Sequence, residues 1–100
     1  MAAPSVRFHP SAITEAKAAH DWYAKRNPSA AAAFMAALDD AIGVIRKSPA
    51  RWPQHSHDTR KYLLRRFPYA VIYRVTDATI EVVAVAHGRR RPGYWRRRSL

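Results

Sequence analysis

The stretch that decides the fold is residues 59–100, TRKYLLRRFPYAVIYRVTDATIEVVAVAHGRRRPGYWRRRSL. It contains three short runs of β-branched and aromatic residues, a composition typical of strands. Pro68 separates the first run from the second, and the short polar link 76–78 separates the second from the third. Links of this length predict hairpins, so we expect an antiparallel three-stranded meander. Its expected strands are 59–67, 69–75 and 79–86.

The residues before this meander must supply the layer that covers it. Residues 5–9 (SVRFH) alternate apolar and polar side chains, which predicts a short strand. Apolar residues then recur at helical spacing in 11–26 and in 28–47. Between these segments stands Asn27-Pro28, a capping side chain followed by a proline suited to the first helical position. Alanines on both segments let the axes approach closely, which predicts an antiparallel helical hairpin.

The helix start and the buried helix faces are also predicted from the sequence. Ser11 is the expected N-cap of the first helix, and Glu15 is suited to its first turns, near the positive end of the helix dipole. Apolar spacing predicts the residues that face the core. They are Ile13, Ala16, Ala19 and Tyr23 in the first helix, and Ala30, Ala33, Phe34, Ala37, Leu38, Ala41, Ile42 and Ile45 in the second.

Together these segments predict an α+β fold in the order β-α-α-β-β-β. An N-terminal strand precedes an antiparallel two-helix hairpin, which packs on one face of a mainly antiparallel sheet completed by the C-terminal meander. The first strand is expected beside the last or the central strand of the meander. One hundred residues predict a single domain, 1–100, with a basic tail at 87–100. The sheet face away from the helices is expected to stay open for a partner.

The charge balance restricts the partners. Lysine and arginine number 18 against 7 acidic residues, a formal net charge of +11. Such a field favours an anionic partner: nucleic acid, an acidic protein or a membrane surface. No segment approaches the length of a bilayer span and the N-terminus lacks the apolar run of a signal peptide, so we expect no membrane association and a cytoplasmic location.

No cofactor is expected. The chain has no cysteine, which excludes a disulfide framework, a thiolate metal site and a cysteine nucleophile. His55 and His57 have a spacing that chelates metals in an extended segment, but no clear third ligand stands beside them. We therefore expect no metal site.

The basic tail is the best candidate for chemistry. Of its residues, His87 is the first choice for a general acid or base and Tyr94 the second, with arginines to stabilise phosphorane-like charge. Glu81 lies six residues upstream of His87 and shares its face if the strand is regular. The alternative is that His87 only ends the strand and that the arginines bind an acidic protein.

Guanidinium groups bind phosphate or carboxylate in bidentate fashion, and aromatic rings stack on bases. Strand alternation places Arg60 and Arg66 on one face of their strand and Lys61 and Arg65 on the other. The candidate residues for binding a target or partner are Arg60, Arg66, Arg89, Arg90, Arg91, Tyr94 and Trp95.

Several motifs are more specific than these patterns. They are Val6-Arg7-Phe8-His9-Pro10, Asp21-Trp22-Tyr23, Ser48-Pro49, Trp52-Pro53 and, above all, RRFPYAVIYR at 65–74 and VAHGRRRPGYW at 85–95. With the predicted order of elements, they resemble the RelE/ParE superfamily of bacterial toxins from type II toxin–antitoxin modules. Members of its ParE-like branch are often described as plasmid stabilisation proteins.

The resemblance implies a growth-arresting protein that a cognate antitoxin holds inactive through an acidic, partly disordered segment that wraps the toxin. ParE-like members inhibit DNA gyrase, whereas RelE-like members cut mRNA in the ribosomal A site. The C-terminal HGRRRPGYW is closer to the ParE-like pattern, so the first hypothesis is a gyrase inhibitor. A ribosome-dependent endoribonuclease is the alternative, with His87, Arg65, Arg74 and Tyr94 as its catalytic set. A third hypothesis is a non-toxic member that only binds its antitoxin, and a homodimer or toxin–antitoxin hetero-oligomer is compatible with each.

Overall fold

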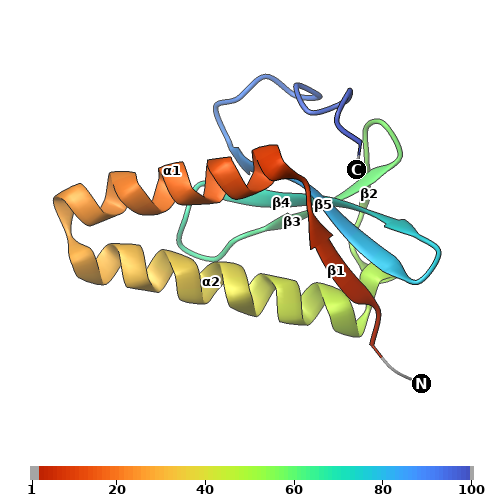
Figure 1. Cartoon of the computed structure of the whole chain (residues 1–100), viewed down its shortest axis with the longest axis horizontal. Helices are drawn as coiled ribbons and strands as arrows, with labels where there is room; N and C mark the ends of the chain where they lie inside the picture. The colour runs from red at the N-terminus through yellow and green to blue at the C-terminus, as the bar shows by residue number, and fades with distance from the viewer. Residues whose placement is uncertain (1–2, 100) are drawn as a thin grey trace.

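The computed structural model describes residues 3–99, and their fold is α+β as predicted. One strand, two helices, a short 3-10 turn and four further strands follow one another along the chain, and the five strands form one sheet (Figure 1). The strand β2 and the 3-10 turn η1 were not predicted. The elements are β1 (Ser5–Phe8), α1 (Pro10–Arg26), α2 (Pro28–Lys47), η1 (Pro49–Arg51), β2 (Gln54–His55), β3 (Thr59–Leu63), β4 (Tyr69–Thr76) and β5 (Thr79–His87).

The sheet has the order β1-β5-β4-β3-β2. β1 lies parallel to β5, with Ser5 opposite Thr79, and the other neighbours are antiparallel. The mainly antiparallel sheet and the position of the first strand beside the last are therefore confirmed. A two-residue turn joins β4 to β5, and its Asp77 adopts a positive φ of 54°, a conformation that favours Asn, Asp and Gly.

The first strand of the meander is shorter than predicted. β3 ends at Leu63, and the chain turns through 64–68, where Arg66 has a φ of 70°. Because Arg65 and Arg66 lie in this turn, strand alternation does not apply to them. The predicted sharing of faces with Arg60 and Lys61 was therefore wrong.

The helix hairpin begins one residue earlier than expected. His9 caps α1, since its Nδ1 accepts a hydrogen bond from the Ser11 backbone N–H at 3.0 Å, and Pro10 is the first helical residue. The prediction of Ser11 as the N-cap was wrong because the proline suits the first turn. The Asn27 cap was correct: its side chain accepts from the Ser29 N–H at 2.9 Å.

The core-facing stripe of α1 also differs from the prediction. Ala12 is fully buried, whereas Ile13 is 56% exposed. Residues 12, 16 and 19 have helical spacing just as the predicted stripe 13, 16, 19 and 23 does, and the alanine face brings α1 close to β5. On α2 the prediction holds for Phe34, Leu38, Ala41 and Ile45, but Ala33 is exposed and Ala31 is buried in its place.

The helix α2 is long and apolar enough, by length and composition, to cross a membrane. The expectation that no segment reaches that length was therefore wrong. In this fold α2 packs Phe34, Leu38 and Ile45 into the core and exposes the adjacent carboxylates of Asp39 and Asp40. A helix that buries one apolar face against a sheet meets the same criteria of length and composition.

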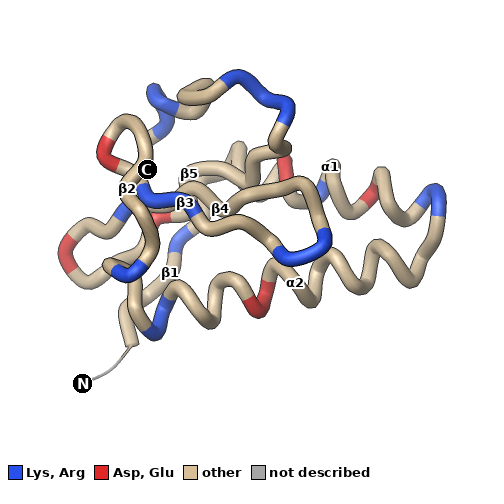
Figure 2. Tube along the Cα trace, turned by 180° about the vertical axis from the view of Figure 1, so that it is seen from behind, with Lys and Arg blue, Asp and Glu red and all other residues tan. Residues whose placement is uncertain are grey.

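The sheet face away from the helices is not open, contrary to expectation. The helices cover the face that carries Val71, Tyr73 and Val85. The residues that follow β5 fold back over the opposite face, where Trp95 packs on Ile72 and its neighbours. Figure 2 shows this segment from behind, with Lys and Arg along it. We call residues 88–99 the C-terminal segment.

We predict that Leu38→Ala lowers the free energy of unfolding by about 2–5 kcal/mol, because Leu38 is 4% exposed and its removal leaves a cavity between α2 and the sheet. Urea denaturation measures this change. Ile13→Ala is the matched control, with an expected loss under about 1 kcal/mol since that side chain is mostly in solvent. A loss below about 1 kcal/mol for Leu38→Ala would contradict this packing.

Candidate functional site

The C-terminal segment returns to the sheet through a series of tight turns. The Gly88 N–H donates to the Pro68 carbonyl at 2.8 Å, which ties the end of β5 to the β3–β4 turn. Further on, Gly93 has a φ of +78°, in the region that favours glycine. Its Cα lies against the His57 ring, and a Cβ there would approach that ring to 3.2 Å. This turn directs Tyr94 and Trp95 back toward the protein.

The carboxylate of Glu15 anchors this segment. Its Oε1 accepts the Val85 backbone N–H at 3.0 Å and Arg98 Nη1 at 2.9 Å. Its Oε2 accepts the Tyr94 hydroxyl at 2.7 Å and Arg98 Nη2 at 2.9 Å. A carboxylate has about four acceptor positions, so every one of them is occupied. Glu15 is only 15% exposed, and the bidentate guanidinium compensates its charge.

The same ion pair supplies hydrogen-bond partners to the backbone of β5 beyond the end of β1. β1 pairs with β5 from Thr79 to Val82 and then ends, because Pro10 begins α1. Beyond this point the Val85 N–H donates to Glu15, and the Val83 carbonyl accepts from Arg98 Nη1 at 3.0 Å. Two side chains thus satisfy backbone groups that would otherwise lack a strand neighbour.

The sequence analysis assigned Glu15 to the helix dipole and did not predict that it anchors the C-terminal segment. One feature of the sequence could have indicated this contact. Glu15 follows Ala12 by three residues and precedes Ala16 and Ala19, so it shares the small-residue face of the helix. A carboxylate on the face that packs against a sheet requires a buried partner, and the arginine-rich tail supplies one.

Tyr94 serves this anchor as a neutral donor. Burial, and then its hydrogen bond to Glu15, raise the pKa of Tyr94 far above the usual range of a tyrosine. The hydrogen bond to Glu15 is also the main reason that the pKa of Arg98 is raised. A general acid or base works best with a pKa near the operating pH, so the environment of Tyr94 does not suit proton transfer at neutral pH.

Trp95 belongs to the small hydrophobic core on the sheet face opposite the helices. It is 3% exposed, and its ring stacks on His55 with centroids 5.5 Å apart and an interplanar angle of 25°. Burial lowers the pKa of His55, with smaller contributions from Lys61 and His57. In this conformation the Trp95 ring packs against its own chain and is not available to the partner for which the sequence suggested it.

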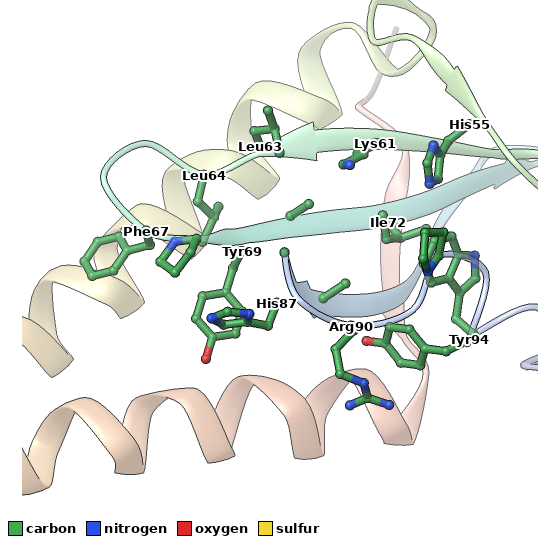
Figure 3. A pocket seen from close by; sticks show the side chains of 16 residues that line it. His55, Lys61, Leu63, Leu64, Phe67, Tyr69, Ile72, His87, Arg90 and Tyr94 are labelled. Carbon is green, nitrogen blue, oxygen red and sulfur yellow. The ribbon is translucent and has the colours of Figure 1, made fainter.

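A groove of about 280 Å³ lies between the C-terminal segment and the strands β3 and β4 (Figure 3). Its floor is apolar, with Ile72 near the middle and Leu63, 67% exposed, at the edge. His87 stands at one end of the groove, at the edge where it also faces α1 on the helix side of the sheet, and its ring centroid is 5.0 Å from that of Tyr69 in an edge-on arrangement. The His87 Nδ1 accepts the Arg89 backbone N–H at 3.0 Å.

Arg90 and Lys61 place positive charge along this groove. The Arg90 guanidinium lies 3.9 Å from the centre of the Tyr94 ring, a cation–π contact. Lys61 projects from β3 on the same side of the sheet as Ile72, its partner on β4. The groove therefore combines an apolar floor with a cationic rim and two histidines, His55 and His87.

The structure separates the four candidate ribonuclease residues. His87 and Tyr94 line the groove, but Arg65 lies in the β3–β4 turn beside Asp40 of α2. Tyr69 on β4 pairs with His87, and Arg74 lies five residues further along β4. Arg74 is therefore about 16 Å from this pair along the strand. Its Nη1 lies 3.4 Å from the Arg98 carbonyl.

The candidate binding residues are also divided. Arg60 is partly buried, and its guanidinium donates to the Trp52 carbonyl at 2.6 Å, while Arg66 lies in the same turn as Arg65. Arg89 and Arg91 are exposed on the C-terminal segment near Arg90. Of the candidate binding residues, Arg90, Tyr94 and Trp95 line the groove.

Glu81 does not share a face with His87. A register shift between Ile72 and Tyr73 places an extra residue in β5, so that Ala84 pairs with Ile72 and Val82 with Tyr73. After this bulge the strand parity reverses. Glu81 pairs with Arg74 on the side of the C-terminal segment, and His87 pairs with Tyr69 on the helix side. The expected shared face of Glu81 and His87 depended on a regular strand and was wrong.

Within residues 3–99 no cluster of three or more histidine or acidic side chains could hold a metal ion. His55 stacks on Trp95, and His57 adopts a φ of 61° next to Gly93. The two histidines thus take part in packing the C-terminal segment.

We predict that Tyr94→Phe lowers the free energy of unfolding by about 1–3 kcal/mol at pH 7, because it removes a hydrogen bond to a charged acceptor. The pKa of Tyr94 is raised in the folded state, so its contribution is complete below pH 10, the usual tyrosine pKa, and declines as the pH rises above it. The difference between wild type and Tyr94→Phe should therefore shrink between pH 9 and pH 11.5 in urea titrations. Tyr62→Phe, a partly buried position on β3, is the control. A difference that stays constant over this range would contradict the assignment.

Comparison with known proteins agrees with this architecture. The family model of the ParE toxin of the type II toxin–antitoxin system parDE matches residues 6–92. The structure is similar to a solved chain of the chromosomal ParDE toxin–antitoxin system from P. aeruginosa, with a TM-score of 0.74 at 17% identity. The alignment covers 84% of this chain and 95% of that one. No curated protein matches the sequence significantly. The family match spans most of the residues, and the chain therefore belongs to the ParE toxin family of type II toxin–antitoxin systems.

Proposed function

We propose that this chain arrests growth by inhibiting DNA gyrase, without cutting RNA, and that a cognate antitoxin neutralises it. Membership of the ParE family supports a toxin role and implies an antitoxin partner. The observation that carries the choice of mechanism is the separation of the candidate ribonuclease residues. His87 lies in the groove, Arg65 lies beside α2, and Arg74 lies toward the far end of β4.

The chemistry of the two groove residues also favours inhibition by binding. The Tyr94 hydroxyl is committed to Glu15, and the His87 Nδ1 is occupied by the Arg89 N–H. Proton transfer requires a free group within reach of substrate, and these two contacts occupy the Tyr94 hydroxyl and one of the two ring nitrogens of His87. A binding inhibitor requires only an accessible surface, which the groove and its cationic rim provide.

One observation favours the endoribonuclease alternative. His87, Lys61 and Arg90 line the same groove, and this combination suits a phosphate group and one acid or base. The non-toxic alternative, in which the chain only binds its antitoxin, needs nothing beyond the groove itself. Both alternatives are outcomes of the experiment below.

The groove and its rim also suit the proposed antitoxin. An acidic, partly disordered segment would bury apolar side chains on the groove floor and place carboxylates near Lys61 and Arg90. A homodimer or a toxin–antitoxin hetero-oligomer is compatible with this arrangement. The expected place of action is the cytoplasm, where gyrase and ribosomes are found.

A gyrase supercoiling assay tests the proposal. We predict that the purified chain blocks supercoiling of relaxed plasmid, and that the triple variant Arg89→Ala, Arg90→Ala, Arg91→Ala requires at least about tenfold more protein, the effect of losing one charge-assisted contact. His87→Ala should inhibit as the wild type does. A parallel translation reaction, with ribosomes stalled on a defined A-site codon, should leave the mRNA intact.

Each alternative has its own result. A codon-positioned cut that disappears in His87→Ala would replace gyrase inhibition by ribonuclease activity. Normal supercoiling, intact mRNA and normal growth on expression would leave a member that only binds its antitoxin. Co-expression of the antitoxin should restore growth if the chain is toxic.

A further inference from the structure

The positive charge of this protein is concentrated away from its helices. The helical hairpin, residues 10–47, carries five Lys and Arg against four Asp and Glu. The sheet, its loops and the C-terminal segment together carry thirteen Lys and Arg against three Asp and Glu. Nearly all of the net charge of +11 therefore belongs to the sheet layer and the segment that covers it.

The arginines of the C-terminal segment form the densest part of this charge. The segment contains six arginines and no acidic residue. In residues 3–99, Arg98 is the one among the six that forms an ion pair with a carboxylate. The other five are exposed, and Figure 2 shows Lys and Arg in blue along the segment. They are Arg89, Arg90, Arg91, Arg96 and Arg97.

The aromatic residues of the segment are not exposed beside these arginines. Trp95 is 3% exposed, and the Tyr94 ring lies between Glu15, Arg90 and the Trp95 ring. Proteins that bind single strands present aromatic rings on which bases stack. This surface presents guanidinium groups without such rings, which suits contacts to a phosphate backbone that carry no sequence information.

We propose that the C-terminal segment binds double-stranded DNA through its phosphates, without sequence preference. Glu15 holds the segment against the sheet through Tyr94 and Arg98, so the backbone that carries the exposed arginines lies on the side of the molecule opposite the helices. Duplex DNA offers a regular row of phosphates to such a surface, and neutralising them releases counterions. This activity is separate from the proposed inhibition of gyrase, and its test contains no gyrase.

Fluorescence anisotropy with a labelled 30-base-pair duplex of mixed sequence tests the proposal on the full chain between 50 and 200 mM NaCl. The longest dimension of the protein, 40 Å, corresponds to about 12 base pairs, so this probe offers a complete site. Binding to at least four phosphates predicts a slope of about −3.6 or steeper for the logarithm of the association constant against that of the salt concentration.

Two matched variants locate the site. Arg89→Ala, Arg91→Ala, Arg97→Ala removes three exposed arginines of the segment and should weaken binding at least about tenfold at 100 mM NaCl, with a slope shallower by up to about 2.7. Lys17→Ala, Lys25→Ala, Lys47→Ala removes the same charge from the helices and should change the Kd by less than about threefold. Circular dichroism and thermal unfolding verify that both variants fold.

Four results would overturn the proposal. One is no binding at 50 mM NaCl with protein at about 100 μM, the weak end of non-specific affinities. Another is an equal loss in the two variants, since total charge rather than the segment would then be responsible. The third is tighter binding of a single-stranded 30-mer than of the duplex. The fourth is equal competition by poly-L-glutamate, which would assign the surface to an acidic protein instead.

Discussion

The buried ion pair between Glu15 and Arg98 is the interaction on which the rest of the structure depends. It connects the first turns of α1, the edge of β5 and the last turn of the C-terminal segment. A carboxylate at this depth is stable only when its charge and its acceptor positions are satisfied, and here both are. Without this anchor the C-terminal segment would have a single apolar attachment, Trp95, and the far face of the sheet would be exposed.

This arrangement explains why the arginine-rich tail is ordered. A run of arginines repels itself and tends toward disorder. Here the Gly88 hydrogen bond to Pro68 fixes the start of the segment, and two aromatic residues and one ion pair fix its second half. The chain thereby presents five exposed guanidinium groups on a segment that is packed against the sheet. Less conformational entropy is lost when such a surface meets an anionic partner, whether antitoxin or nucleic acid.

Most of the fold could be predicted because local patterns agree with the tertiary structure. The Asn27-Pro28 boundary, the apolar stripe of α2 and the short hairpin link each specify one structure. The errors on α1 and β5 have a common cause, which is that long-range contacts decided between local alternatives. Two stripes on α1 have helical spacing, and packing on β5 selects the one with Ala12. The bulge in β5 gives no clear signal in VVAVA, so strand parity could not be extended from Glu81 to His87.

In the candidate site, too, local patterns predicted some features and long-range contacts decided others. Residue types predicted that chemistry and binding concentrate in the C-terminal segment, but they did not indicate which of its residues are structural. Trp95 and Tyr94 looked like partner-binding aromatics because they stand among arginines, yet one fills the core and the other donates to a carboxylate 79 residues earlier. A sequence pattern cannot separate an aromatic that awaits a partner from one that packs on its own sheet. The tertiary structure makes that distinction, because it brings Glu15 to the Tyr94 hydroxyl and the sheet to the Trp95 ring. The exposed arginines are then the residues of the segment that can contact another molecule.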